Sequence, residues 1–210
     1  MAYGLQIFRD DGSLWMSPDV TPMNFIKKIR FNAGSGELAT GIPEGKSIAF
    51  FVRHDQEHGR GLFSQIKNGG QWNIKYKDAR VAGYLYIFAN WVNKTSGYGV
   101  AVYNAGAEMV WNTGMLPLQL TYIDNPYGVD QRGDITIGVG FNVAVLPGVC
   151  STWLAPLEPA HHIFLVGSLL AGASGNNIYI TRYDGTQVNG TTPAWRYRDK
   201  FLCINTDYYD

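Results

Sequence analysis

The sequence has no surplus of charge and no long apolar run, and each absence excludes a class of protein. Lys and Arg number 17, as do Asp and Glu, so the formal net charge is zero. Nucleic-acid binding usually needs excess cations to displace counterions from phosphates, so we do not expect that function. No stretch approaches the roughly 18 apolar residues of a membrane span, and no basic patch precedes an apolar stretch as in a secretory signal. We therefore expect neither membrane insertion nor export.

Cysteine is also scarce. Cys150 and Cys203 are the only two in the chain. Without an export signal, buried free thiols are the favoured interpretation over a disulfide. The cysteines and histidines do not have metal-ligand spacing. We expect no metal and no cofactor.

Long uninterrupted segments are rare, because 25 Gly and 9 Pro are spread throughout the chain. Helices of three turns have little room between such breaks. The remaining segments are rich in β-branched and aromatic residues, which strands prefer. With 46% hydrophobic residues, the chain can bury a substantial core. The sequence therefore predicts an all-β fold.

An internal repeat divides the chain. A Tyr-Gly start at Tyr3 leads through an apolar strand and a turn ending at Gly12 to a return strand ending at Trp15. A second Tyr-Gly start at Tyr98 leads through a turn at Gly106 to a return ending at Trp111. Glycine turns between apolar runs are typical of hairpins. We expect two tandem β-sandwich-like modules, 1–97 and 98–210, whose packing as one sandwich or apart stays open.

Further strands follow from apolar runs and alternation. They are expected at Phe25–Phe31, Ser47–Val52, Trp72–Lys77, Tyr84–Trp91, Leu118–Ile123, Ile135–Val145, His162–Val166, Ile178–Tyr183 and Trp195–Ile204. The glycine-rich stretch Gly34–Gly36 and the pair Asp184-Gly185 are expected to be turns.

The second module is expected to carry an insertion. His162–Val166 is similar to Ser47–Val52, but it lies farther from its Tyr-Gly start, by about 20 residues. The extra residues are placed in the loop-like segment 124–152. Inserted loops often carry function, although a long hairpin between two ordinary strands explains the segment equally well.

No catalytic motif stands out in the sequence. His54–His58 holds two histidines and two carboxylates, but Gly59 and Gly61 follow at once, so we expect a solvated loop there. The sequence contains no G-x-S-x-G elbow, and no carboxylate pair is distinctive of a glycosidase. The sequence predicts a protein that is not an enzyme.

Aromatic residues in polar or loop contexts are the remaining candidates for function. Such residues form sugar-stacking platforms or anchors of protein interfaces, with core packing as the alternative for each one. The candidates for ligand or partner binding are Trp72, Tyr76, Tyr127, Trp153, Trp195, Tyr208 and Tyr209.

The opening Met1–Phe8, followed by Asp11-Gly12 and an apolar return, resembles small β-rich accessory proteins of tailed-bacteriophage tail modules. The resemblance covers about the first 16 residues and, more weakly, the segment from Tyr98 to Trp111. It implies a component of the tail tip, baseplate or fibre, assembled in the host cytoplasm and present in the virion. It also implies other tail proteins as partners and a homotrimer.

Three functions remain open from sequence. The first is a structural or attachment protein of a phage tail, which contacts other tail proteins and a host surface receptor. The second is a carbohydrate-binding module that stacks host glycan on Trp72, Tyr76 or Trp153. The third is a polysaccharide hydrolase, which would need two carboxylates facing each other across a cleft.

Overall fold

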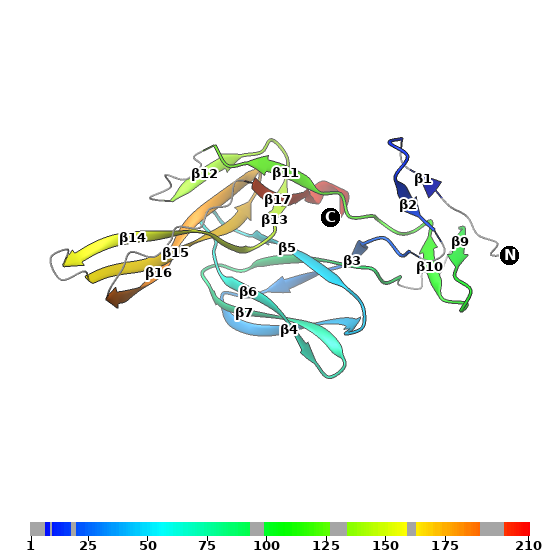
Figure 1. The fold of residues 1–210 in the computed structure, drawn as a ribbon, viewed down its shortest axis with the longest axis horizontal. Coiled ribbons are helices and arrows are strands. Elements are labelled where there is room, and N and C mark those ends of the chain that lie inside the picture. The colour runs from blue at the N-terminus through cyan, green and yellow to red at the C-terminus, as the bar shows by residue number, and fades with distance from the viewer. Residues whose placement is uncertain are drawn as a thin grey trace.

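A computed structural model of the chain describes residues 7–8, 10–17, 20–92, 99–126, 134–158, 163–189 and 200–210. These residues form strands almost throughout, with no α-helix and one short 3-10 turn, η3 (Thr206–Tyr208). The predicted all-β fold is therefore confirmed, and its packed sheets are of the sandwich type (Figure 1).

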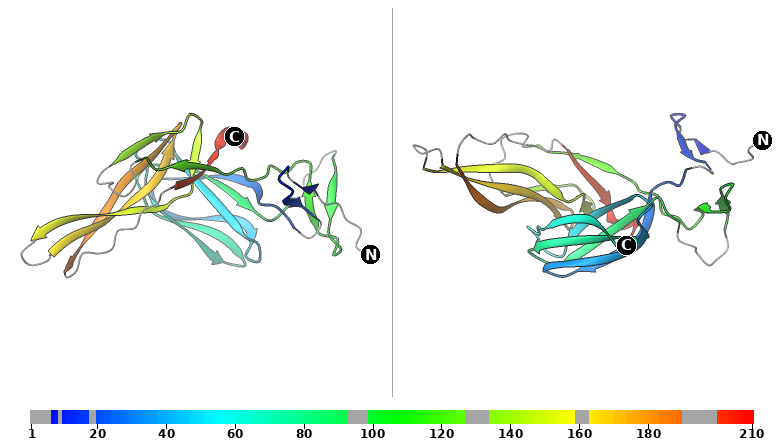
Figure 2. Two further views of the ribbon diagram at one scale, coloured as in Figure 1. Left: turned by 45° about the horizontal axis from the view of Figure 1, so that its top comes forward. Right: turned by 60° about the horizontal axis from the view of Figure 1, so that its bottom comes forward.

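The two expected hairpins are present. In the first, β1 (Ile7–Phe8) pairs antiparallel with β2 (Leu14–Met16), and in the second, β9 (Ala101–Tyr103) pairs antiparallel with β10 (Met109–Asn112). Tyr3 and Tyr98 lie outside the described residues. Both hairpins lie at the same end of the elongated molecule in every view (Figures 1 and 2).

The first half then builds a two-layer sandwich. Its strands are β3 (Asn24–Phe31), β4 (Gly34–Pro43), β5 (Ile48–His54), β6 (Leu62–Asn68), β7 (Gln71–Ala79) and β8 (Gly83–Ala89). Strands β3, β8 and β5 are neighbours in one sheet, and β4, β7 and β6 form the other. Between the layers lie fully buried side chains such as Val52, Ile74 and Leu85.

The second half repeats this plan. Its strands are β11 (Thr121–Asp124), β12 (Ile135–Gly138), β13 (Val143–Val145), β14 (Gly148–Glu158), β15 (Ile163–Ser174), β16 (Asn177–Asn189) and β17 (Lys200–Asn205). Strands β11, β17 and β13 are neighbours in one sheet, and β12, β16, β15 and β14 form the other. Its core includes Val145, Leu169 and Cys203.

The two halves share one strand order. The order β3-β8-β5 corresponds to β11-β17-β13, and β4-β7-β6 corresponds to β12-β16-β15, so β14 is the added strand. The equivalent strands β5 and β13 pair antiparallel at Val52 and Val145, which joins the halves into one six-stranded sheet. We infer an approximate twofold axis between these strands. Each half keeps its own core, and the two cores lie on one face of the shared sheet.

The opposite face of the shared sheet has a thinner cover. Its apolar residues include Phe51, Phe88 and Ile204, and Tyr209 packs against them from the segment that follows η3. The Tyr209 ring lies 5.0 Å from Phe88 and 5.3 Å from Phe25, centroid to centroid. A few residues after β17 thus seal this face.

Several expectations need correction. Ile135–Val145 is two strands in different sheets, because the chain turns at Gly140, whose φ is +80°. Gly34–Gly36 belongs to β4, and a Cβ on Gly36 would meet the Tyr76 hydroxyl at 2.6 Å. Asp184-Gly185 lies inside β16, where the pairing with β15 shifts register.

The expected insertion is also placed differently. Segment 124–152 is not one loop, since it contains β12, β13 and the beginning of β14. The structural partner of β5 is β13, and Ile163, which the sequence matched to Ile48, begins β15 instead. The length difference therefore comes partly from the added strand β14. Strands β14, β15 and β16 run outward as a long arm at the end away from the hairpins (Figures 1 and 2).

Candidate functional site

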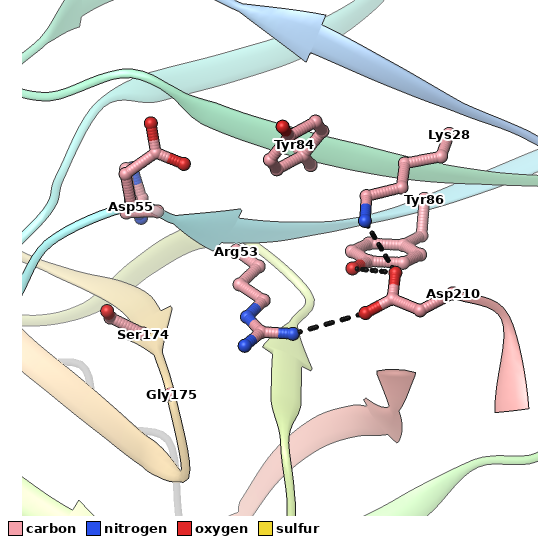
Figure 3. Close-up of a pocket in the computed structure, with 9 residues that line it drawn as sticks. Lys28, Arg53, Asp55, Tyr84, Tyr86, Ser174, Gly175 and Asp210 are labelled. Atoms are coloured by element: carbon pink, nitrogen blue, oxygen red, sulfur yellow. Dashed lines mark hydrogen bonds and ion pairs between the residues drawn. The ribbon is translucent and has the colours of Figure 1, made fainter. Parts of the chain in front are cut away.

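A polar pocket of about 480 Å³ lies on the thinly covered face of the shared sheet (Figure 3). Side chains from β3, β5 and β8 form one wall, and Ser174 at the end of β15 and Gly175 in the turn that follows also line the pocket. The segment after η3 contributes Asp210. The pocket therefore lies where both halves of the chain meet.

Strand register explains why these side chains gather. Lys28 is the cross-strand partner of Tyr86, and Tyr84 has Arg30 on one side and Arg53 on the other. Cross-strand partners share one face of a sheet. Lys28 lies 4.3 Å from the centroid of the Tyr84 ring, and the Arg30 guanidinium lies 4.8 Å from it. The ring of Tyr84 is thus already in contact with two cations.

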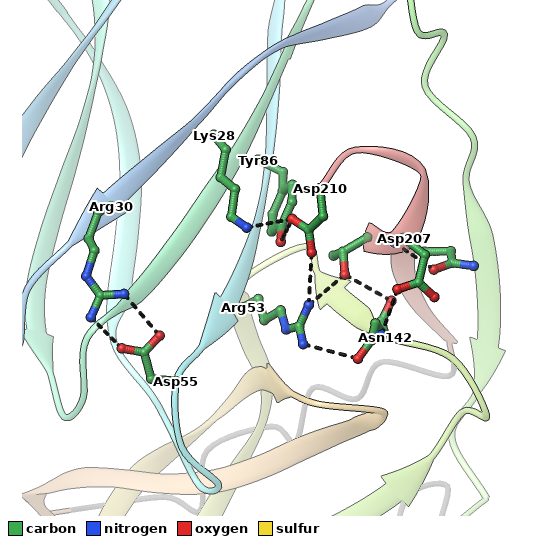
Figure 4. Close-up of polar contacts among 10 residues, drawn as sticks. Lys28, Arg30, Arg53, Asp55, Tyr86, Asn142, Asp207 and Asp210 are labelled. Atoms are coloured by element: carbon green, nitrogen blue, oxygen red, sulfur yellow. Dashed lines mark hydrogen bonds and ion pairs between the residues drawn. The ribbon is translucent and has the colours of Figure 1, made fainter.

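Asp210 is the centre of a hydrogen-bond network in this pocket (Figure 4). Its Oδ1 accepts from Lys28 Nζ at 2.5 Å and from the Tyr86 hydroxyl at 2.7 Å, and Arg53 lies 3.4 Å from Oδ2. Burial alone would raise the pKa of Asp210, but the bonds from Lys28 and Tyr86 and the nearby cations lower it below its usual value. The carboxylate therefore stays ionised and holds the segment after η3 against the sheet.

Arg53 extends the network to the second half. It donates to Thr206 Oγ1 at 2.8 Å and to Asn142 Oδ1 at 3.1 Å, and Asn142 in turn donates to Asp207 at 2.6 Å. On the other wall, Arg30 forms a two-point contact with Asp55 at 3.2 and 2.6 Å. Most charged groups of the pocket thus bind one another, as expected of a structural contact. We refer to the contacts of Asp210 with Lys28, Arg53 and Tyr86 as the clasp.

Among the predicted aromatic residues, two are buried. Tyr76 is 7% exposed and packs with Phe31 and Phe63 in the first core. Tyr209 is 6% exposed, and its hydroxyl donates to Pro117 O at 2.8 Å. Neither ring is an exposed platform, because Tyr76 faces the covering sheet of the first sandwich and Tyr209 packs onto the shared sheet.

The other predicted aromatics differ in their settings. Trp72 is half-buried, its Nε1 donates to Lys46 O at 2.7 Å, and Lys67 lies 5.3 Å from its ring centroid. Tyr208 is 57% exposed. Trp153 lies in β14, with its side chain outside the description, and Tyr127 and Trp195 lie outside the described residues. The structure therefore does not bring the described candidates together in one site.

His54 is not in a solvated loop as expected. It ends β5, is 3% exposed and lies edge-on to Phe31 with 5.6 Å between ring centroids. Neither ring nitrogen makes a well-aligned hydrogen bond. Burial lowers its pKa to about 4, against smaller raising effects of the Ala173 backbone and Asp55. Asp55, Gln56 and Glu57 are exposed, as expected of a loop.

Cys150 and Cys203 are free and buried, as the sequence predicted. Burial raises the pKa of Cys203 to about 11. Among the described residues, no group of three or more His, Cys, Asp or Glu side chains is arranged to hold a metal ion. The pocket residues Lys28, Arg53 and Asp210 were not among the sequence candidates, because their meeting depends on contacts between distant segments.

No family model, curated protein or solved structure matches the chain. In the part of the chain that the structure describes, no helix is long and apolar enough to cross a membrane.

Proposed function

We propose that this chain is a non-enzymatic structural or attachment protein of a phage tail. It acts through contacts with other tail proteins and with a host surface. The observation that carries the proposal is the hairpin end, which exposes apolar side chains from both copies of the repeated element. Phe8 on β1 is 55% exposed, Tyr103 on β9 is 52% exposed and neighbouring Val100 is 60% exposed. Aromatic side chains such as Phe8 and Tyr103 are enriched at protein interfaces.

The surrounding sequence supports the same role. Between Gly99 and Leu120 the only charged residue is Glu108, so the second hairpin offers few groups for ionic recognition. Two-stranded hairpins gain little stability alone and need packing partners. A neighbouring tail protein that covers the hairpins would supply that packing. The clasp at Asp210 supports a structural role, because it uses the pocket's charged groups to hold the chain together.

Co-sedimentation with tails tests this function. Tails are purified from a phage lysate of the strain that encodes the chain and probed with an antibody against it. We expect the chain in the tail fraction and immunogold label at one end of the tail. The chain carrying Val100→Lys and Tyr103→Lys should leave the tail fraction, whereas the control Tyr122→Lys, at a position 63% exposed on β11, should remain. A chain never found with tails would contradict the proposal.

A further inference from the structure

In the described part of the chain, the three larger sheets end in the outer strands β3 and β11, β4 and β6, and β12 and β14. In the first half, β6 has β7 on one side and no described strand on the other. In the second half, the same is true of β14, which pairs only with β15. Open edges present unpaired N–H and C=O groups, and proteins usually cover or protect them.

The duplication shows what the edge of β6 can accept. Its equivalent in the second half is β15, which carries an additional antiparallel strand along most of its length. That strand, β14, has no counterpart among the described residues of the first half. The same sheet position is therefore filled in one half and open in the other.

The open edge of β6 is accessible. Ser64, Gln65, Lys67 and Asn68 are exposed, and Leu62, Phe63 and Ile66 are partly exposed. The edge of β14 is long, with 11 residues, and it is interrupted by bulges near Val149 and Glu158 and by Pro156, which has no N–H to donate. Between these bulges the strand has a regular stretch that a further strand can follow.

Charge distinguishes the pairings these edges allow. The one charged residue of β14 is Glu158 and the one charged residue of β6 is Lys67. If two β6 strands paired, their charged residues would both be lysines, and if two β14 strands paired, both would be glutamates. Pairing β6 with β14 contributes one charge of each sign, which favours this combination. The zero net charge of the chain also lets copies approach each other.

We propose that the open edge of β6 binds the outer edge of β14 from a second copy of this chain. The contact is β-strand addition, in which main-chain hydrogen bonds hold the two copies together. Because the two edges differ, the contact is head-to-tail and closes into a ring or continues as a filament. This interaction does not depend on the tail assignment, since it rests on the sheet order, the exposure of β6 and the charges of the two strands.

Cysteine crosslinking of the full chain tests the pairing. Gln65→Cys is placed on β6 and Trp153→Cys on β14, with Thr152→Cys as a second position on β14. A short bismaleimide is added to the double variant and to each single variant. The native thiols are buried, Cys150 at 3% and Cys203 at 0% exposure, and the unmodified chain controls for them. Far-ultraviolet circular dichroism confirms that each variant is folded.

We expect crosslinked dimers and larger multimers from the double variants and none from the single variants. Light scattering should give the unmodified chain a mass that is a multiple of 23.3 kDa, about 70 kDa for a ring of three. Ser64→Lys with Gln65→Lys should reduce it to one chain, and Tyr122→Lys should not. Self-crosslinking of a single variant, a monomeric unmodified chain, or folded double variants without multimers would overturn the proposal. Tail incorporation with any of these results would leave the proposed function standing.

Discussion

Lys28 on β3 and Asp210 after η3 form an ion pair at 2.5 Å, although Lys28 lies in the first strand of the first sandwich and Asp210 follows the last strand of the second. Arg53 and Tyr86 also donate hydrogen bonds to the Asp210 carboxylate. The contact fixes the segment that seals the thinly covered face of the shared sheet. Its contribution to stability can be measured directly.

Asp210→Asn should destabilise the protein by about 1 kcal/mol, because it removes the charge that Lys28 and Arg53 share at a partly exposed site. Urea unfolding measures the change. The matched control is Asp124→Asn, whose partner Lys200 lies 3.4 Å away with both side chains largely exposed. That variant should change stability by less than about 0.5 kcal/mol. Equal effects in both variants would show that the clasp adds nothing specific.

Tyr209→Ala should cost about 3–5 kcal/mol, in the range of other buried aromatic truncations. The ring is 6% exposed and contacts Phe25 and Phe88. The neighbouring Tyr208 is 57% exposed, so Tyr208→Ala should cost less than about 0.5 kcal/mol. Thermal or urea unfolding of the pair tests the difference. A larger loss at Tyr208 would contradict the described packing.

The stability of the protein should fall as the pH drops from about 6.5 to about 4, in part because of His54. Its folded pKa is lower than its unfolded value, so the unfolded chain binds the proton first and acid favours unfolding. The loss from this group is of the order of 3 kcal/mol. His54→Leu removes the titrating ring and should flatten the pH dependence of unfolding over this window. An unchanged slope in His54→Leu would show that His54 is not the group responsible.

Gly172→Ala should be strongly destabilising, by at least about 1–3 kcal/mol. A Cβ on Gly172 would meet Gly59 O at 2.1 Å and His54 Cε1 at 3.2 Å, where β15 crosses the loop after β5. Gly45→Ala is the control, because its Cβ would have no neighbour within 4 Å. Unfolding in urea compares the two. Similar stability of both variants would mean that β15 does not approach Gly59 so closely.

Local sequence was sufficient to predict much of this architecture. Apolar runs and glycine turns marked both hairpins, and the runs near Phe25 and Tyr84 became β3 and β8. Sequence similarity misassigned the equivalence of the halves, however, since β5 corresponds to β13 and not to β15. The equivalence depends on which strands pair, and pairing is a contact between distant segments.

The candidate site was the least predictable part. Tyr76 alternates with lysines, a pattern equally compatible with an inward or an outward ring, and only the covering sheet settles that it is buried. No local sequence pattern marks the side chains that bind the Asp210 carboxylate, because these donors come from three separate strands.

The sequence by itself determined the strand-forming character of the chain, its doubled opening hairpin and its two free thiols. These follow from residue type, alternation and turn chemistry, which act over a few neighbours. The tertiary structure alone decided that equivalent strands pair at Val52 and Val145 and that His54 is buried. It also decided that Asp210 holds the segment after η3 against the shared sheet. Burial and charge pairing at these positions come from residues distant in the sequence, so no local pattern encodes them.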